Sequence, residues 1–569
     1  MVETIRFFDT TLRDGQQGPG LGVKEKGRLA IAIGLSYVGV DAIEIGFGAN
    51  NAEFEMIREI AGLVGNKSYS PTGRIPQIFS LARALPDDVE LAYKSIELVD
   101  PENRGLHVFI GTSQKMREHS VKKKMEDILD MVPARIEQAR KLLKGKGVIE
   151  YSSEGATVTE LDFLVETCQV AVNAGANIIN VPDTTGYCHW KDYAKIIRTI
   201  KKEVTGIENV ILSAHIHHDS GLSVATSLAG IEAGVRQVEG CVLQLGERAG
   251  NVDWMTVLAD LVTMPRYRKK FDVSHIDSGN LWTLANLVSS VTHVPIPENH
   301  PVIGLAAYTE SSGIHVNGVL ENETTYFEAN PRSFGREIDI VPGQTCGVNT
   351  VEHFLARHGY GRVGEAYSMK KLRRLTDAVK GFSIDVEDSP NPTEMKLLAD
   401  HYILGKPFKA RIKLENFRFI NSLNENPLIE VTVSVDGKVR RGTATGKGTI
   451  DCYMNAFHEA LGIPEGTIQL PVWKENAYYY GMSAPGFKLL EKMPLGGEER
   501  RSLEINGSTS AGQEAIARSQ VEISIMGDVF HGRASHTDIT ASSYFAIANA
   551  FDAAYRLGKH IDWVGGLTV

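Results

Sequence analysis

Residues 213–251 read SAHIHHDSGLSVATSLAGIEAGVRQVEGCVLQLGERAGN. Within an apolar run at the start of this stretch, His215 and His217 are two positions apart. Because side chains alternate along a β-strand, both imidazoles are directed to the same face. Such a pair is typical of metal ligands, although histidines on a buried strand are also often satisfied by backbone carbonyls. The stretch therefore suggests a strand that carries a metal site.

The alternation of apolar runs and longer helical patterns extends outward from this stretch, over residues 5 to about 265. The eight strand candidates are Ile5–Leu12, Asp41–Phe47, Pro76–Ala82, Leu106–Ser113, Val148–Glu154, Asn177–Asp183, Val210–Asp219 and Gln237–Gly246. Between them, segments such as Lys24–Val38 and Asp162–Ala174 have apolar residues at helical spacing. Eight such units predict an α/β protein with a closed (β/α)8 TIM barrel over residues 1–270. A doubly wound open sheet is the alternative, but no GxGxxG motif follows the first strand.

The composition favours a small-molecule enzyme. Of 569 residues, 43% are hydrophobic and 23% charged, and the net charge of -10 disfavours a nucleic-acid partner. We find no apolar run of membrane-spanning length, and the first strand candidate starts too early to leave room for a targeting peptide. The five scattered cysteines include no CxxC motif, so neither a disulfide framework nor a thiolate zinc site is predicted. We expect a cytoplasmic protein with no nucleic-acid or membrane partner.

Polar residues gather where the predicted strands end, which is where TIM barrels place their active sites. These residues are Arg13, Asp14, Glu44, Thr112, Ser113, Ser152, Glu154, Asp183, Thr184, His215, His217, Glu247, Arg248 and Asn251. Carboxylate, imidazole and amide groups without a thiolate suit a divalent ion such as Mg, Mn or Zn. The sequence therefore predicts a divalent metal site at the mouth of the barrel.

Four motifs resemble those of the acyl-CoA-condensing branch of the DRE-TIM metallolyases. They are FDTTLRDGQQ at Phe8–Gln17, the HIH strand followed by Asp219 and Gly221, GERAGN at Gly246–Asn251, and ESSGIH at Glu310–His315. This family includes the 2-isopropylmalate, homocitrate and citramalate synthases. The resemblance implies a Claisen-type condensation of acetyl-CoA with a 2-oxo acid at a divalent metal ion, which yields a 2-alkylmalate and CoA.

The same resemblance implies roles for individual residues at the metal. Asp14, His215 and His217 would be the metal ligands, with Asn251 as a further or water-mediated ligand. Arg13 would neutralise the enolate or enol oxygen that develops during condensation, as a fixed cation directed at transition-state charge.

The resemblance also implies a substrate pocket beside the metal. Glu154 would take part in proton transfer, and Ser152, Asn180 and Thr184 would contact the keto acid. Each of the three could instead serve only to hold the local structure. The sequence leaves the 2-oxo acid open among 2-oxoisovalerate, pyruvate, 2-oxoglutarate and bulkier acids.

Three positions need separate interpretation. His218 stands where the family usually has asparagine, and we expect its side chain to point away from His217 and to support or pack rather than to bind the metal. Residues 48–51 read GANN where relatives have proline and serines, so the keto-acid side chain is uncertain. Cys241 lies in a predicted strand, not in the glycine-rich loop that holds the cysteine of hydroxymethylglutaryl-CoA lyases, which favours a buried structural thiol.

The middle of the chain follows a different pattern from the barrel. Residues 271–382 contain a helix candidate at Asn280–Val291 and resemble small helical subdomains that reach the partner subunit. His315 and Tyr326 would then enter the partner's active site and assist proton transfer, so a homodimer with shared active sites is implied. For both residues, simple packing is the alternative. Residues 383–405, acidic and proline-bearing at their start, are interpreted as a linker.

The C-terminal domain, residues 406–569, contains an internal repeat. VTVSVDGKVRRGTA from Val431 and VEISIMGDVFHGRA from Val521 align Gly437 with Gly527, Gly442 with Gly532 and Ala444 with Ala534. Each copy predicts a β-β-α unit whose helix lies at Asp451–Leu461 or Ala541–Tyr555. The duplication resembles the regulatory domain of 2-isopropylmalate synthases, which binds an amino-acid effector, and this favours 2-oxoisovalerate as the keto acid. A purely dimerising domain is the alternative.

Two other functions remain open at this point. An acyl-CoA lyase would run the carbon-carbon bond step backwards on a related barrel, but ESSGIH and the C-terminal repeat disfavour it. A non-catalytic metabolite sensor would not need the complete set of predicted catalytic and metal-binding residues.

Overall fold

A computed structural model describes residues 2–49, 53–386, 388–422, 425–446, 448–463, 468–479, 515–525, 528–536 and 539–557. The chain divides into two compact units. One consists of Met1–Glu310 and Asn322–Asp339, and the other of Ser311–Glu321 and Ile340–Val569. Asn50 and Asn51 of the GANN segment, and Gly527 of the internal repeat, lie outside the described residues.

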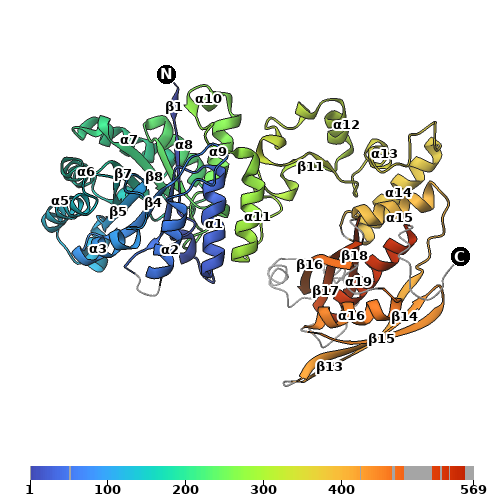
Figure 1. Cartoon of the computed structure of the whole chain (residues 1–569). Coiled ribbons are helices and arrows are strands. Elements are labelled where there is room, and N and C mark those ends of the chain that lie inside the picture. The colour runs from blue at the N-terminus through green and yellow to red at the C-terminus, as the bar shows by residue number, and fades with distance from the viewer. Residues whose placement is uncertain are drawn as a thin grey trace, which may run out of the picture. The chain divides into compact units, whose positions relative to one another are not determined.

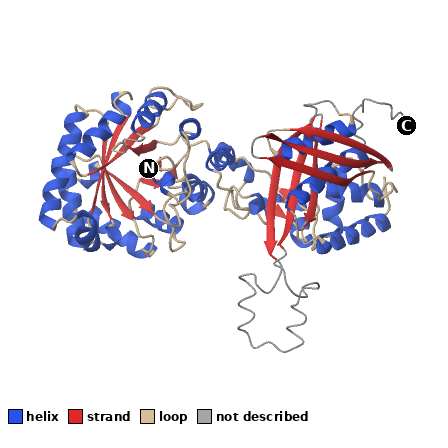
Figure 2. Cartoon of the chain, turned by 90° about the horizontal axis from the view of Figure 1, so that it is seen from below, coloured by secondary structure: helices blue, strands red, loops and turns tan. Residues whose placement is uncertain are grey.

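The first unit contains a closed barrel of eight parallel strands that neighbour one another in chain order, with helices on the outside (Figures 1 and 2). The barrel closes where the last strand pairs with the first, with Arg6 opposite Gln237. The strands are β2 (Arg6–Asp9), β3 (Ala42–Phe47), β4 (Gln77–Arg83), β5 (Arg104–Gly111), β6 (Val148–Glu154), β7 (Ile178–Asp183), β8 (Ile211–Ile216) and β9 (Gln237–Gly240). The predicted TIM barrel is confirmed, and the open sheet is excluded.

One helix of eight residues or more follows each barrel strand and buries its apolar face against the sheet. These helices are α1 (Glu25–Val38), α2 (Phe54–Val64), α3 (Pro86–Ser95), α5 (Met125–Leu142), α6 (Leu161–Ala174), α7 (Trp190–Glu203), α8 (Ser223–Ala233) and α9 (Trp254–Thr263). Helix α1 ends at Gly39, whose φ of +89° lets its N–H bond the carbonyls of Leu35 and Ser36. None of the helices in the described ranges is long and apolar enough to cross a membrane.

The strands β8 and β9 are shorter than the sequence predicts. We expected the seventh strand to reach Asp219, but β8 ends at Ile216, and His217 then forms an isolated bridge with Asn251. Strand β9 ends at Gly240, where a Cβ atom would lie 2.3 Å from the carbonyl oxygen of Val252. Cys241 therefore lies just beyond the strand rather than inside it, which corrects the prediction. The early ends of both strands turn the chain into the mouth of the barrel.

Strand β1 (Glu3–Thr4) precedes the barrel and pairs with β10 (Phe271–Asp272), which follows it. The other elements between the barrel and the C-terminal domain are α10 (Pro265–Arg268), α11 (Leu281–Thr292), β11 (Thr309–Glu310), α12 (Gly313–Glu321), β12 (Asp339–Ile340), α13 (Val348–Arg357), α14 (Met369–Asp385) and α15 (Pro392–Tyr402). The segment 383–405, expected to be a linker, instead contains the end of α14 and all of α15. Helix α15 starts at a capping box in which Asn391 and Glu394 bond each other's backbone N–H. Its Met395 and Leu398 are buried in a core shared with α13 and α14.

The C-terminal domain consists of two copies of a β-β-β-α unit. The first is β13 (Ile412–Ser422), β14 (Glu425–Val435), β15 (Lys438–Thr445) and α16 (Thr449–Leu461), and the second is β16 (Ile468–Tyr479), β17 (Ala515–Ile525), β18 (Asp528–His536) and α19 (Ile539–Arg556). Each copy therefore has one strand more than predicted. The two helices meet at Tyr453 and Tyr544, whose rings stack with centroids 4.1 Å apart. Gly442 and Gly532 occupy equivalent positions: a Cβ atom at either would lie 1.9 Å from a helix carbonyl, of Ala456 or Ala546.

Candidate metal centre and active site

Three side chains converge at the mouth of the barrel as potential metal ligands. Asp14 begins the short helix after β2, His215 lies on β8 and His217 follows it, and all three are buried. Among the described residues they form the group whose ligand atoms are close enough to share an ion. The two Nε2 atoms lie 3.4 Å apart, and Asp14 Oδ2 lies 3.6 Å from that of His215 and 3.9 Å from that of His217. A point equidistant from these atoms lies about 2.1 Å from each, which is a normal metal–ligand distance.

Asn251 is held beside this cluster by its amide nitrogen. Its Nδ2 donates to Asp14 Oδ1 at 2.7 Å and to the carbonyl of Leu245 at 3.1 Å, whereas its buried Oδ1 has no hydrogen-bond partner. Gly246 makes room for this arrangement: its φ is +139°, and a Cβ atom there would lie 2.3 Å from Asn251 Nδ2 and 2.9 Å from Asp14 Oδ1. The free Oδ1 and the cluster of imidazole and carboxylate groups fit a divalent cation.

The electrostatics of the cluster follow from its buried charges. Although burial opposes ionisation, Arg13 and His215 hold the pKa of Asp14 well below its usual value. Burial would also lower the pKa of His215, but Asp14 and the buried Glu239 on β9 raise it to about 9. Burial and the positive charge of His215 lower the pKa of His217 to about 3. The site therefore holds an ionised carboxylate and at least one neutral imidazole at neutral pH.

Arg13 begins a chain of buried polar contacts that runs through the barrel interior. Its Nε donates to Glu44 Oε2 at 2.5 Å, and Glu44 Oε1 lies 2.7 Å from His107 Nδ1. His107 Nε2 lies 2.6 Å from Ser152 Oγ, which also accepts from Asn180 Nδ2 at 2.8 Å. The structure thus connects Arg13, Ser152 and Asn180, three residues predicted for the site, through Glu44 and His107.

No motif in the sequence pointed to His107 and Glu239. Both are polar residues on barrel strands, β5 and β9, and both are buried. Glu239 Oε2 lies 3.3 Å from Nδ1 of His215, and Glu239 Oε1 accepts from Ser213 Oγ at 2.7 Å. Their positions along the strands could have revealed them, because alternate residues of a barrel strand point into the barrel.

Glu154 and Thr184 lie at the ends of neighbouring strands. Burial raises the pKa of Glu154, and the nearby Arg13 partly opposes that shift. A carboxylate with a raised pKa is a stronger proton acceptor than an ordinary one. The hydroxyl of Thr184 accepts from the backbone N–H of Gly155 at 3.0 Å, so it joins the loops after β6 and β7.

His218 and Cys241 lie outside the set of potential ligands. His218 Nδ1 lies 2.5 Å from Ser223 Oγ at the start of α8, which agrees with a supporting or packing role. Cys241 is fully buried, and burial raises the pKa of its thiol well above the usual value. Its Sγ lies 3.2 Å from Thr10 Oγ1 and 3.5 Å from Asn251 Nδ2. A neutral thiol packed beside Asn251 agrees with the structural role.

His315 and Tyr326, the residues predicted to act in a partner's site, fall in different compact units. His315 is on α12 in the second unit, and Tyr326 follows the 3-10 turn Glu323–Thr325 in the first, where it is 42% exposed. Their catalytic roles stay a prediction.

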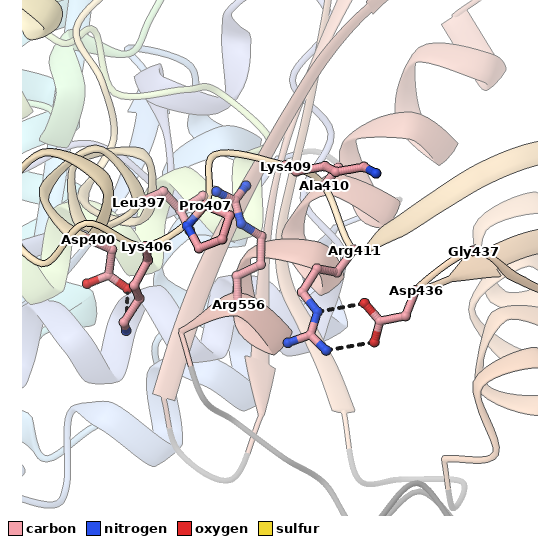
Figure 3. A pocket seen from close by; sticks show the side chains of 10 residues that line it. All are labelled: Leu397, Asp400, Lys406, Pro407, Lys409, Ala410, Arg411, Asp436, Gly437 and Arg556. Atoms are coloured by element: carbon pink, nitrogen blue, oxygen red, sulfur yellow. Dashed lines mark hydrogen bonds and ion pairs between the residues drawn. The ribbon is translucent and has the colours of Figure 1, made fainter. Parts of the chain in front are cut away.

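A charged pocket of about 460 Å³ is lined by α15, by residues 406–411 before β13, by the turn between β14 and β15, and by the end of α19 (Figure 3). Arg411 donates to both carboxylate oxygens of Asp436, at 2.6 and 2.7 Å, and Lys406 pairs with Asp400 at 2.8 Å. Two of the cations in the lining are therefore neutralised by carboxylates of the same pocket.

Known protein families match both compact units. The family described as HMGL-like matches residues 4–288, the homocitrate synthase post-HMGL domain-like family matches 302–383, and the LeuA allosteric (dimerisation) domain matches 391–486. The 2-isopropylmalate synthase of Acidimicrobium ferrooxidans is 33% identical over 98% of this chain and 97% of its own. That of Pyrococcus furiosus is 31% identical over 98% of this chain and 100% of its own. Among solved structures, the hydroxymethylglutaryl-CoA lyase of Pseudomonas aeruginosa is 18% identical, with a TM-score of 0.42 over 52% of this chain and 95% of its own.

The family match over residues 4–288 and the relatives that match nearly the whole chain define the class: the chain belongs to the HMGL-like family. Within that family, its relatives over the full length of both proteins are 2-isopropylmalate synthases.

Proposed function

We propose that the protein is a 2-isopropylmalate synthase, which condenses acetyl-CoA with 2-oxoisovalerate and releases CoA and 2-isopropylmalate for leucine biosynthesis. The observation that carries this proposal is the similarity to 2-isopropylmalate synthases across 98% of the chain, which includes the C-terminal domain as well as the barrel. A lyase related only through the barrel would not account for that domain.

Asp14, His215 and His217 hold the divalent ion, with Asn251 Oδ1 as a further or water-mediated ligand. Such an ion supplies Lewis acidity toward the carboxylate and ketone of a 2-oxo acid. Mg, Mn and Zn all suit this set of donors, because it combines oxygen and nitrogen atoms without a thiolate.

Arg13 stabilises the oxygen charge that develops when the acetyl group loses a proton. Glu44 supports this role, because its 2.5 Å contact fixes the guanidinium in a buried position before the reaction begins. Glu154 takes part in proton transfer at the same mouth, where burial raises its pKa and so makes its carboxylate a better proton acceptor. His315 and Tyr326 of the partner subunit assist that transfer in a homodimer with shared active sites.

Ser152 and Asn180 form the keto-acid side of the pocket, and His107 joins them. Asn180 Oδ1 is buried without a hydrogen-bond partner, so it can accept a hydrogen bond from a group that enters the pocket. Thr184 acts beside them by holding the loop after Glu154 and contacting the substrate carboxylate.

The C-terminal domain joins the two subunits and binds an amino-acid effector, and the protein works in the cytoplasm. The match to a LeuA allosteric (dimerisation) domain supports both the dimer and the effector.

The test is a thiol-release assay with acetyl-CoA and a panel of 2-oxo acids, namely 2-oxoisovalerate, pyruvate and 2-oxoglutarate. We expect CoA release that depends on the keto acid and is fastest with 2-oxoisovalerate. A preference for pyruvate or 2-oxoglutarate would make the protein a citramalate or homocitrate synthase instead. Release that no keto acid stimulates would reject a synthase altogether.

A further inference from the structure

The loop between β5 and α5 carries four exposed lysines at the mouth of the barrel. Residues 115–124 contain Lys115, Lys122, Lys123 and Lys124, and we call this segment the lysine loop. Among the described residues, none of these four ammonium groups forms an ion pair. Two of the acidic groups close in sequence are engaged locally: Glu118 accepts from the side chain of Gln114 at 2.9 Å, and Asp127 accepts from the backbone N–H of Lys124 at 3.0 Å.

The backbone of the lysine loop is fixed by a buried arginine. Arg117 pairs with both carboxylate oxygens of Glu160, at 2.7 and 2.9 Å, and also donates to the carbonyl of Thr112 at 2.5 Å. Its guanidinium lies over the ring of Phe163. These contacts therefore fix the backbone that carries the four lysines.

The conformation of the loop is also unusual. Residues Arg117–Val121 form a π-helix, a rare element that is frequent at functional sites. Lys122 follows with a φ of +54°, in the left-handed region that lysine seldom adopts. Local strain of this kind persists where the surrounding contacts enforce it and is concentrated at binding sites.

The loop packs directly beside the carboxylate of Glu154. A Cβ atom at Gly111 would lie 3.0 Å from Val121 Cγ2 and 3.4 Å from Glu154 Oε2, so only the space of one glycine separates the loop from that side chain. On the other side, a Cβ atom at Gly155 would lie 2.9 Å from Met116 Sδ. The lysines that follow Val121 are therefore close to the predicted point of proton transfer.

We propose that the lysine loop binds the phosphate groups of the CoA part of the acyl donor. This inference rests on the proposed function and adds a subsite to it. CoA carries a 3′-phosphate and a pyrophosphate, whereas the chain has a net charge of -10 and would repel it without a local excess of positive charge. Lysine ammonium groups are suited to phosphate as compact point charges with several donors. Their position beside Glu154 leaves the thioester end of the donor free to reach the pocket.

The chain provides a matched control at the other end of α5. The triple variant Lys122→Ala/Lys123→Ala/Lys124→Ala removes three lysines before the helix, and Lys141→Ala/Lys144→Ala/Lys146→Ala removes three at and after its C-terminal end. The two groups are separated by the length of the helix, about 27 Å. Both include one lysine in the left-handed region, Lys122 at +54° and Lys144 at +53°, so the change in charge and in backbone strain is the same.

Steady-state kinetics with acetyl-CoA and with acetyl-pantetheine, which lacks the nucleotide, test the proposal. In the loop variant, we expect the ratio of kcat/KM for acetyl-CoA to kcat/KM for acetyl-pantetheine to fall about tenfold, mainly because the KM for acetyl-CoA rises. The KM for acetyl-CoA should also lose its dependence on salt. Acetyl-dephospho-CoA would show how much of the effect belongs to the 3′-phosphate. The control variant should keep the wild-type preference.

An unchanged preference in the loop variant, or an equal fall in both variants, would overturn the proposal. Either result would leave the proposed function intact as long as the wild-type protein releases CoA with a 2-oxo acid. Failure of the wild-type protein to do so would reject the proposed function itself.

Discussion

Arg13 Nε donates to Glu44 Oε2 at 2.5 Å, and the Glu44 carboxylate is fully buried. Burial alone would raise the pKa of Glu44, but Arg13 and His107 lower it, so the carboxylate stays ionised. The guanidinium, in turn, is held in one orientation toward the metal ligands, because its Nη1 donates to Asp14 Oδ2 at 2.6 Å. The buried ion pair therefore helps to fix the orientation of Arg13, the cation proposed to stabilise the developing oxygen charge.

Replacing Glu44 by glutamine should reduce turnover far more than it disturbs the fold. The amide keeps the shape but not the charge, so Arg13 loses one of the two carboxylates that orient it. We expect kcat to fall about 10²–10³-fold, as when one preorganised charge-stabilising group is removed. Asp88→Asn is the matched control, because Asp88 pairs with Arg83, whose side chain is 55% exposed. Thiol-release kinetics measure both, and wild-type kcat in Glu44→Gln would show that Arg13 does not depend on this partner.

Removing the metal should abolish CoA release, and adding back Mg, Mn or Zn should restore it. His217→Ala should weaken binding of Mn or Zn by more than about 100-fold in isothermal titration calorimetry, while the circular dichroism spectrum stays that of the wild type. His218→Ala is the control, since that ring contacts Ser223 and not the cluster. Equal metal affinity in His217→Ala and the wild type would place the site elsewhere.

Gly246→Ala should damage the metal site by steric means alone. The new Cβ would meet Asn251 Nδ2 at 2.3 Å and Asp14 Oδ1 at 2.9 Å, and the φ of +139° adds backbone strain. We expect metal affinity to fall at least about tenfold. Gly73→Ala separates the steric clash from the backbone strain, because Gly73 also has a positive φ, of +77°, but has open space around its Cβ position. Titration calorimetry with the same metal salt should show a loss only in Gly246→Ala.

The periodicity of the first half of the chain was sufficient to predict the barrel. Residues Val148–Glu154 were predicted as a strand, and β6 has the same bounds. The ends of β8 and β9 were not predictable in this way. The chain leaves the sheet at Ile216 and at Gly240 to form tertiary contacts with residues 250–253, which no local pattern encodes.

The C-terminal domain shows a second limit of reasoning from sequence. The internal repeat begins at Val431 and Val521, so it revealed the later two strands of each unit and their helices. Strands β13 and β16 precede the repeat and were missed. In the site, the motifs singled out Asp14, His215 and His217, which the structure brings together. His107 and Glu239, in contrast, required knowledge of which strand residues point into the barrel.

The stability of the barrel should depend on pH through Asp260, on α9. Burial raises the pKa of this carboxyl group to about 6. Because the folded-state pKa lies above the unfolded value of 3.8, ionising Asp260 costs more in the folded protein than in the unfolded chain. The free energy of unfolding should therefore fall as the pH rises from about 4 to about 6. Asp260→Asn should therefore match the wild type near pH 4 and exceed it by about 2 kcal/mol at pH 8. Urea unfolding monitored at both pH values checks this, and an advantage that does not change with pH would contradict it.

Gly442→Ala and Gly532→Ala should destabilise the C-terminal domain to a similar degree. Gly442 pairs with Val431 and Gly532 with Val521, and at each site the strand passes so close to a helix that a Cβ atom would lie 1.9 Å from its backbone carbonyl. Each helix must move away and lose part of its packing, which should cost at least about 2 kcal/mol. Differential scanning calorimetry of the full chain should show the loss.

Gly381→Ala provides the comparison for these two variants. Gly381 lies within α14 with open space at its Cβ position, so alanine there should stabilise by about 0.5–1 kcal/mol through better helix propensity. A loss in only one of Gly442→Ala and Gly532→Ala would show that the two units, although alike in sequence and strand order, do not share the same close contact between strand and helix. A similar loss in both would mean that the duplication preserves the packing of the domain and not only its topology.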